Sequence, residues 1–206
     1  MNSIISALQI PIMIVILLFS VIIHEVSHGM VAEKLGDPTA RRQGRITLNP
    51  LPHIDIIGSI ILPAAAVIFN LPLLGWAKPV PIDIRQFRDP MRDFAMTALA
   101  GPVSNLAQVM VYSLIFHGAM ALGWVWLASI ASLGIYINLL LALFNLLPIP
   151  PLDGSRLIAA VLPQDMGWQF LSIGRYGFMI LMFLIFTGVL RPLWAFVGML
   201  HSAIIY

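Results

Sequence analysis

The sequence predicts an all-α polytopic membrane protein with about five or six transmembrane helices, a re-entrant or hairpin segment and short membrane-associated strands. Of its 206 residues, 60% are hydrophobic and only 10% are charged, and the mean hydropathy is +0.95. Soluble domains carry about 25% charged residues, so this chain has too few polar side chains to cover itself in water. At about 20 residues per span, we expect a single integral-membrane domain, with a core over about 8–163 and C-terminal helices over about 165–206.

The N-terminal third combines one long apolar segment with polar and interrupted stretches. The first span is expected from about Leu8 to Leu35, because Gly36-Asp37-Pro38 is a strong helix stop. A polar stretch follows over 39–55, and within it Arg45–Leu48 fits a short strand. Residues 56–74 are apolar but contain one glycine and two prolines, which a re-entrant or hairpin segment would tolerate.

The remainder of the chain is dominated by apolar segments. Val80–Arg85, within the polar stretch 78–92, is a candidate extended edge. The second long apolar segment ends at Pro148-Ile149-Pro150-Pro151, because no helix continues through these prolines. In chain order, the expected helical segments are Phe94–Met120, Leu122–Leu147, Asp153 to about Leu162, Tyr176–Leu190 and Leu193–Tyr206.

The basic residues indicate which side of the membrane the loops occupy. Eight of the eleven lie between Lys34 and Arg92, in two loops, and the positive-inside rule places both loops in the cytoplasm. Residues 56–74 therefore should not cross the membrane completely. The basic residues are too few to form a nucleic-acid-binding surface. The absence of cysteine excludes disulfides and thiolate metal sites.

The sequence His24-Glu25-Val26-Ser27-His28 matches the pattern H-E-x-x-H inside the first apolar segment. Residues four apart share one face of a helix, so both imidazoles can bind one Zn²⁺, with Glu25 beside them as general base. The alternative is a chance match, with the histidines bonded to neighbouring backbone in a helix bundle. Ionisable residues within a membrane are costly and are functional candidates by default, so the pattern favours one Zn²⁺ per chain.

A hydrolytic zinc site takes three protein ligands and leaves one position open for water. Without cysteine, the third ligand must be His, Asp or Glu at membrane depth. Most carboxylates lie in polar stretches, whereas Asp153 follows the helix end broken by prolines. Irregular backbone at that depth is tolerated only against protein or a polar cavity. The alternative role of Asp153 is to cap the following helix, and the two roles are compatible.

The charge pattern and the proposed ligands give the same topology. The first span exits on the basic side, with His24 and His28 in its second half. Asp153 reaches that side only if an even number of crossings separates it from Leu35, and the two long segments between them supply two. We therefore expect a multi-pass protein of the plasma or inner membrane, with the site toward the cytoplasmic side.

Six blocks follow one another from residue 24 to residue 154, about two thirds of the chain. They are His24-Glu25-Val26-Ser27-His28-Gly29 with Ala32, Gly36-Asp37-Pro38-Thr39-Ala40, Asn49-Pro50-Leu51-Pro52-His53-Ile54-Asp55, Gly75-Trp76-Ala77-Lys78-Pro79-Val80-Pro81, Gly101-Pro102-Val103-Ser104-Asn105, and Asn145-x-x-Pro148-x-Pro150-Pro151-Leu152-Asp153-Gly154. This ordered set resembles the site-2 proteases, a family of intramembrane zinc metalloproteases. It is far more specific than H-E-x-x-H alone.

The resemblance implies that His24, His28 and Asp153 bind zinc and that Glu25 activates the water. It also implies that the substrates are transmembrane proteins, cut within or near the lipid bilayer, as in regulated intramembrane proteolysis. Many bacterial relatives carry a PDZ module. This chain resembles a minimal bacterial or archaeal type without one, so the resemblance does not indicate how substrates are gated.

Two further residues are candidates for contact with the substrate or with the oxyanion formed in peptide hydrolysis. Asn145, eight residues before Asp153, is the first, and an interhelical hydrogen bond is its alternative role. His53 is the second, and an interfacial histidine without a role is the alternative. Either candidate strand could hold an unwound substrate segment by strand addition, with plain loop structure as the alternative.

Two other classes of function compete with an intramembrane endopeptidase. One is a transporter or channel with a metal site, in which buried carboxylates would carry ions. The other is an inactive, protease-like binding protein. Glu25 between the two histidines favours the protease, because transport does not require this pattern.

Overall fold

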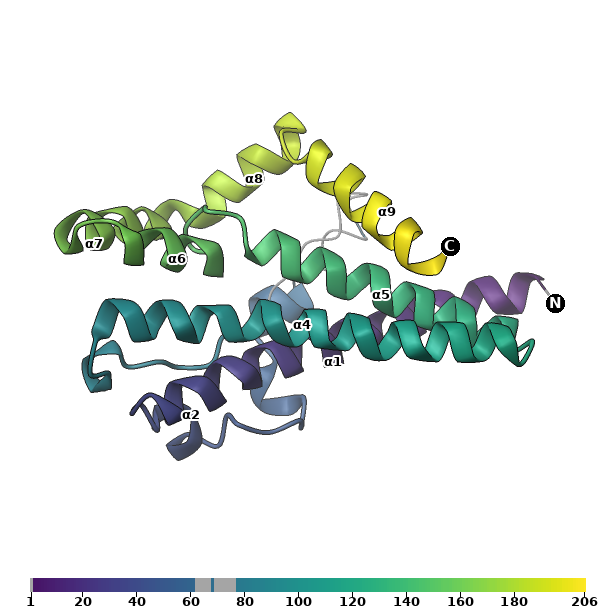
Figure 1. Ribbon diagram of the computed structural model, residues 1–206, viewed down its shortest axis with the longest axis horizontal. Coiled ribbons are helices and arrows are strands. Elements are labelled where there is room, and N and C mark those ends of the chain that lie inside the picture. The colour runs from purple at the N-terminus through teal and green to yellow at the C-terminus, as the bar shows by residue number, and fades with distance from the viewer. Residues whose placement is uncertain (1, 62–67, 69–76) are drawn as a thin grey trace.

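The computed structural model describes residues 2–61, 68 and 77–206 (Figure 1). Its elements are almost all helical, as the sequence predicts. In chain order they are α1 (Asn2–Lys34), α2 (Thr39–Arg42), η1 (Leu51–His53), η2 (Ile56–Ile61), η3 (Ile84–Gln86), α4 (Pro90–Ala121), α5 (Val125–Asn145), α6 (Asp153–Val161), α7 (Gln164–Ser172), η4 (Ile173–Tyr176), α8 (Gly177–Thr187) and α9 (Arg191–Ile205).

Three long helices, α1, α4 and α5, form the centre of the fold. Figure 1 shows α4 and α5 as a long hairpin that packs along α1. The short helix α6 packs on α4 near the end of α1, while α9 crosses back onto α5. An apolar cluster of Val109, Ile135, Leu139 and Val197 joins α4, α5 and α9. This arrangement packs α1 against α4 and brings Asp153, the first residue of α6, next to His24 and His28 in the second half of α1.

Local signals in the sequence set the ends of these helices. Helix α1 stops before Gly36, which has a φ of +114° that favours glycine. Helix α4 begins with Asp89 as its N-cap, whose side chain accepts a hydrogen bond from the Arg92 backbone, and with Pro90 in its first turn. The α4–α5 hairpin turns at Gly123, with a φ of +74°. The long apolar segments therefore begin and end close to where the sequence predicts.

In the described part of the chain, four helical segments are long and apolar enough to cross a membrane. They are Pro11–Lys34, Pro90–Ala121, Val125–Asn145 and Gln164–Thr187, the last of which joins α7, η4 and α8. The all-α polytopic class is confirmed, although the described residues contain fewer spans than the five or six predicted. Residues 56–61 form a π-helix, η2. Most of the predicted re-entrant segment 56–74 lies outside the described residues.

The predicted strands at Arg45–Leu48 and Val80–Arg85 are wrong, since neither segment is a strand in the structure. Side chains from elsewhere in the chain bind the backbone groups that a neighbouring strand would use. Arg45 donates hydrogen bonds to the carbonyls of Lys78 and Pro79, at 2.7 and 3.1 Å. The amide of Val80 donates to Glu25, and the amide of Asp83 donates to Asp37. Pro79 and Pro81 have no amide hydrogen to contribute to a ladder.

Candidate metal centre

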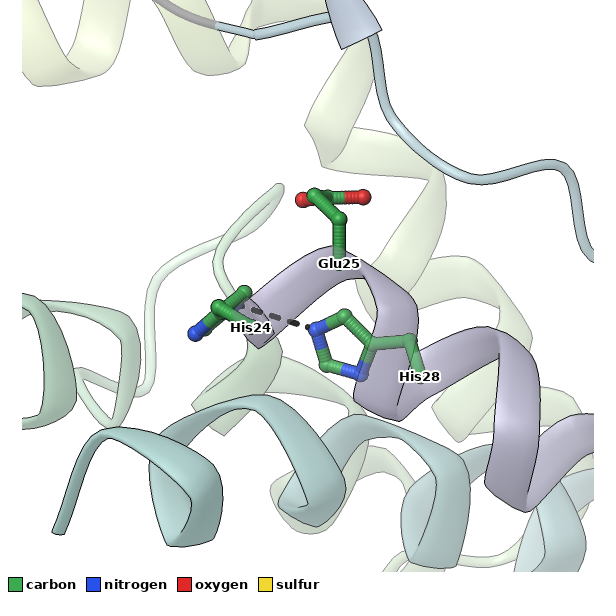
Figure 2. A group of neighbouring side chains, drawn as sticks. All are labelled: His24, Glu25 and His28. Atoms are coloured by element: carbon green, nitrogen blue, oxygen red, sulfur yellow. Dashed lines mark hydrogen bonds between the residues drawn. The ribbon is translucent and has the colours of Figure 1, made fainter. Parts of the chain in front are cut away.

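His24 and His28 lie one turn apart on α1, and their imidazoles face each other. Their Nε2 atoms are 3.1 Å apart, and both side chains are buried. Figure 2 shows the two rings on one side of the helix, with the Glu25 side chain leaving the helix between them. The helical spacing predicted from the H-E-x-x-H pattern is therefore present, and the two rings are close enough to bind the same metal ion.

Asp153 completes a triangle with the two histidines. Its Oδ2 lies 3.2 Å from the Nε2 atoms of both His24 and His28. Asp153 is the first residue of α6, and the N-cap position belongs to Leu152. The alternative role of Asp153 as a helix cap is therefore not the one found. Its Oδ1 instead accepts a hydrogen bond from Arg156, at 3.1 Å.

The other nitrogen of each imidazole has an acceptor of its own. The Nδ1 of His24 lies 2.6 Å from Oδ1 of Asn105, and the Nδ1 of His28 lies 2.7 Å from the carbonyl of Thr97. Because each Nδ1 donates to an oxygen, each neutral ring has a free lone pair on Nε2. Partners of this kind commonly orient histidines that bind metals.

Three donor atoms therefore converge in a buried place where they repel one another. They are two nitrogen lone pairs and a carboxylate oxygen that accepts no hydrogen bond from any described residue. A cation would remove this repulsion. A tetrahedral Zn²⁺ with bonds of about 2.0–2.1 Å has ligand-to-ligand distances of about 3.3 Å, close to the 3.1 and 3.2 Å observed. The geometry and the donor set both fit zinc.

The charge state of Asp153 also suits a cation. The Arg156 guanidinium is a permanent cation 3.1 Å from Oδ1, and it favours the ionised form of this carboxyl. Arg156 also stacks over the ring of Phe94, at 4.4 Å from the ring centroid, which fixes the guanidinium beside Asp153.

Glu25 is placed to act as a base beside the metal ligands. Carboxylate and imidazole donor atoms of Glu25, His24 and His28 all lie within 4.8 Å of one another. The Oε2 of Glu25 accepts a hydrogen bond from the Val80 amide at 2.7 Å. The extended segment after residue 77 thus orients this carboxylate, and one of its oxygens is left for a water or a substrate proton.

A cavity of about 250 Å³ opens at these residues. Its lining combines the polar groups of the triangle with apolar side chains from the extended segment and the helix end broken by prolines. The lining residues are His24, Glu25, His28, Val80, Ile82, Asn145, Pro151, Leu152, Asp153 and Arg156. The cavity is large enough for a short peptide segment and water next to the donor triangle.

Of the two candidates for substrate or oxyanion contact, Asn145 lies at the cavity and His53 does not. Asn145 lines the cavity, and its side-chain amide donates to the Leu141 carbonyl of its own helix at 2.9 Å, so it makes no interhelical bond with a described residue through that donor. His53 is buried away from the cavity, and its Nε2 donates to the Thr47 carbonyl at 2.9 Å. His53 orders its own loop and is not brought to the triangle.

Several residues around the triangle are not among the sequence candidates. Arg156 is one, and Asn105 is another, although it belongs to one of the motif blocks quoted above. Gly101 is a third, because a Cβ there would lie 2.5 Å from the Nε2 atoms of both histidines. A buried asparagine in an apolar helix is a signal that could have identified Asn105. Arg156 lies three residues after Asp153 in a predicted helix, and this spacing is a signal that could have placed it beside Asp153.

Comparison with known proteins gives a consistent set of relatives. The model of peptidase family M50 matches residues 89–186. The chain is 37% identical over 184 residues to "Putative zinc metalloprotease YwhC" of Bacillus subtilis, which covers 86% of this chain and 81% of that protein. It is 28% identical over 179 residues to "Putative zinc metalloprotease Rip2" of Mycolicibacterium smegmatis, covering 84% and 66%. It is 30% identical over 167 residues to "Putative zinc metalloprotease MJ0611" of Methanocaldococcus jannaschii, covering 78% and 74%. No solved structure matches the chain.

Proposed function

This chain belongs to peptidase family M50, the site-2 protease family of intramembrane zinc metalloproteases, and we propose that His24, His28 and Asp153 are its zinc ligands and Glu25 its general base. The protein is a zinc metalloprotease of the membrane that acts on membrane proteins. Nothing in the comparisons supports a transporter or an inactive binding protein. One observation carries the assignment of ligands, namely three donor atoms 3.1 to 3.2 Å apart in a buried place.

The residues around the cavity have different roles in peptide hydrolysis. Zn²⁺, when bound, supplies a Lewis acid that lowers the pKa of a water to about 7. Glu25 takes the proton of the attacking water and passes it to the leaving amide nitrogen. Glu25 lines the cavity, and the Val80 amide donates a hydrogen bond to one of its two carboxylate oxygens. Arg156 neutralises part of the Asp153 charge and keeps Oδ1 away from the triangle, so that Oδ2 alone points at the two imidazoles.

Asn145 is the candidate that contacts the substrate. It lies on the cavity wall at the end of α5, and its Nδ2 has a second hydrogen that the bond to Leu141 does not use. That hydrogen is available to the carbonyl of a substrate peptide or to the oxyanion that forms from it. The apolar lining from Val80, Ile82 and Leu152 suits the side chains of a transmembrane helix that has been locally unwound.

A cleavage assay tests the general base. We expect Glu25→Gln to retain zinc and to cut a membrane-tethered reporter about 10²- to 10⁴-fold more slowly than the wild type, since that is the usual contribution of a general base. Asp165→Gln, at an exposed position on α7, is the matched control. If Glu25→Gln keeps zinc and cleaves at the wild-type rate, Glu25 is not the base.

We also propose that the site faces the cytoplasm, because eight of the eleven basic residues lie between Lys34 and Arg92. The chain has no cysteine, so single cysteines report sidedness without background. Arg88→Cys should react with an impermeant thiol reagent only in inside-out vesicles. Leu122→Cys, in the exposed turn at the other end of α4, should react only in right-side-out vesicles. The opposite pattern would contradict this orientation.

A further inference from the structure

Three buried polar side chains form a hydrogen-bonded chain across the centre of the helical core. They are Ser20 of α1, Asn105 of α4 and Asn138 of α5, and each is completely inaccessible to solvent. The Nδ2 of Asn105 donates to Oδ1 of Asn138 at 2.8 Å, and the Nδ2 of Asn138 donates to Oγ of Ser20 at 2.9 Å. The other end of this chain is Nδ1 of His24, 2.6 Å from Oδ1 of Asn105. None of the three residues lines the cavity.

Two backbone carbonyls set the direction of the hydrogen bonds among these side chains: that of Gly134 for Asn138, and that of Ser20, 3.4 Å from Nδ2 of Asn105, for Asn105. The carbonyl of Gly134 only accepts hydrogen bonds, so the atom of Asn138 that faces it at 3.0 Å must be the amide nitrogen. Oδ1 of Asn138 therefore faces Asn105, which must present its own amide nitrogen in return. Oδ1 of Asn105 is left facing His24, so the proton of that imidazole lies on Nδ1.

This tautomer determines the state of Nε2 of His24, which faces Nε2 of His28 and Oδ2 of Asp153. With its proton on Nδ1, a neutral His24 ring carries a lone pair on Nε2, the atom 3.2 Å from Asp153. The opposite tautomer would place a proton where a metal ion has to bind. His28 needs no such chain, because the Thr97 carbonyl can only accept and fixes the tautomer of His28 directly.

Holding the helices together does not by itself account for this arrangement. Small and apolar side chains pack membrane helices without the cost of burying two amides, and interhelical hydrogen bonds in membranes contribute only modestly to stability. Stabilisation alone also does not require a fixed direction that ends on a ring nitrogen. Of the three hydrogen bonds that link Ser20, Asn138, Asn105 and His24, the one to His24 is the shortest, at 2.6 Å.

We propose that Asn105 and Asn138 are positioning residues, which set the tautomer and the orientation of His24 for metal binding. Asn105 acts on the ring directly, and Asn138 acts by fixing the amide of Asn105, with Ser20 as a further partner of Asn138. This proposal rests on the assignment of His24 as a zinc ligand under the proposed function. It adds a role for residues that do not line the cavity.

Zinc affinity of the purified full-length protein, measured by competition with a chelator, tests the proposal. Partners of metal-binding histidines typically contribute 10- to 100-fold in affinity, so Asn105→Leu should weaken zinc binding by about that factor. Asn105→Asp keeps an oxygen acceptor for Nδ1 but loses the donor to Asn138, so its loss of zinc affinity should be smaller than that of Asn105→Leu. Asn138→Leu should reduce zinc affinity less than Asn105→Leu, because it removes the acceptor of the Asn105 amide but leaves that amide in place. Ser104→Ala is the matched control: among the described residues, the hydroxyl that it removes bonds only the Gly101 carbonyl of the same helix.

Two additional readouts separate positioning from a structural role. The absorption spectrum of the Co²⁺-substituted protein reports ligand geometry and should change in Asn105→Leu but not in Ser104→Ala. The rise in melting temperature on adding zinc should shrink in Asn105→Leu. A role in packing alone would lower the stability of the metal-free protein and leave that rise unchanged. If Asn105→Leu does not fold, Asn105→Ser shortens the side chain and so withdraws the oxygen from Nδ1 of His24 without overpacking the site.

The outcomes distinguish this proposal from the one on which it rests. Wild-type zinc affinity in Asn105→Leu or Asn105→Ser would overturn the positioning role. So would an Asn105→Asp variant that loses as much affinity as Asn105→Leu. His24→Ala provides the reference. If it retains zinc, the ligand set itself is wrong, whereas loss of zinc in His24→Ala together with full affinity in Asn105→Leu refutes only the positioning role.

Discussion

The close approach of α4 to the two imidazoles makes Gly101 a sensitive test of the site. A methyl group there would lie 2.5 Å from Nε2 of His24 and from Nε2 of His28, about 0.9 Å short of the 3.4 Å at which ordinary contact begins. The rings cannot retreat separately, because both are hydrogen-bonded to α4 itself, through Asn105 and through the Thr97 carbonyl. Gly101→Ala must therefore push α1 and α4 apart or rotate both rings.

The magnitudes decide the sign of this effect. Replacing a helical glycine by alanine gains up to about 1 kcal/mol of helix propensity. Overpacking a tight site costs about 1–3 kcal/mol, and a misplacement of about 1 Å in a catalytic site costs about 100-fold in rate. The steric cost of the added methyl group therefore exceeds the gain in helix propensity. We expect Gly101→Ala to lower zinc affinity at least tenfold and to reduce reporter cleavage by about 100-fold.

Gly118→Ala supplies a matched control on the same helix. No described atom lies within 4 Å of the position that its Cβ would occupy, so this variant has the gain in propensity without the clash. Zinc content by mass spectrometry, chelator competition and the rate of reporter cleavage should all match the wild type in Gly118→Ala. If Gly101→Ala matches Gly118→Ala in these measurements, the imidazoles do not lie where the structure places them.

Four further outcomes are expected. Arg45→Ala removes the donor to the carbonyls of Lys78 and Pro79 and should destabilise the protein by about 1–3 kcal/mol in thermal melting. Arg85→Ala, at an exposed arginine paired with Asp83, should change stability little. Removing zinc with a chelator should abolish cleavage and lower the melting temperature, and added Zn²⁺ should restore both; a chelator-resistant activity would contradict a metalloprotease. The hydrogen bond from Arg85 lowers the pKa of Asp83 to about 2, so its stabilising contribution is complete above the unfolded pKa of about 3.9 and is lost as the pH falls toward 2. Because this ion pair is exposed, Asp83→Asn should change the acid limb of the stability curve only slightly, and a large change would contradict this assessment.

The parts of the fold that could be predicted from the sequence depend on local signals. The lengths of α1, α4 and α5 follow from apolar runs bounded by Gly36, by Asp89-Pro90 and by the prolines after Leu147. The spacing of His24 and His28 fixes their common face through helical geometry alone. Asp153 could be singled out because a helix broken by prolines at membrane depth needs a polar cavity beside it.

The features that were missed depend on contacts between distant residues. Two polar segments were predicted to be strands because their sequences favour extended backbone. In the structure, the backbone groups of residues 78–83 form hydrogen bonds with the side chains of Arg45 and Asp37, and not with a neighbouring strand. His53 was a candidate for the site by motif, yet it bonds the Thr47 carbonyl within its own loop. Asn105 and Asn138 meet only because α4 and α5 pack as a hairpin along α1. No local pattern encodes these partners.

The central claim is that His24, His28 and Asp153 hold one zinc ion, and metal content tests it most directly. Purified wild type should contain one zinc per chain. Asp153→Ala, which removes the oxygen 3.2 Å from both imidazoles, should contain almost none, while Asp165→Ala, at an exposed carboxylate on α7, should match the wild type. One zinc per chain in Asp153→Ala would contradict the account.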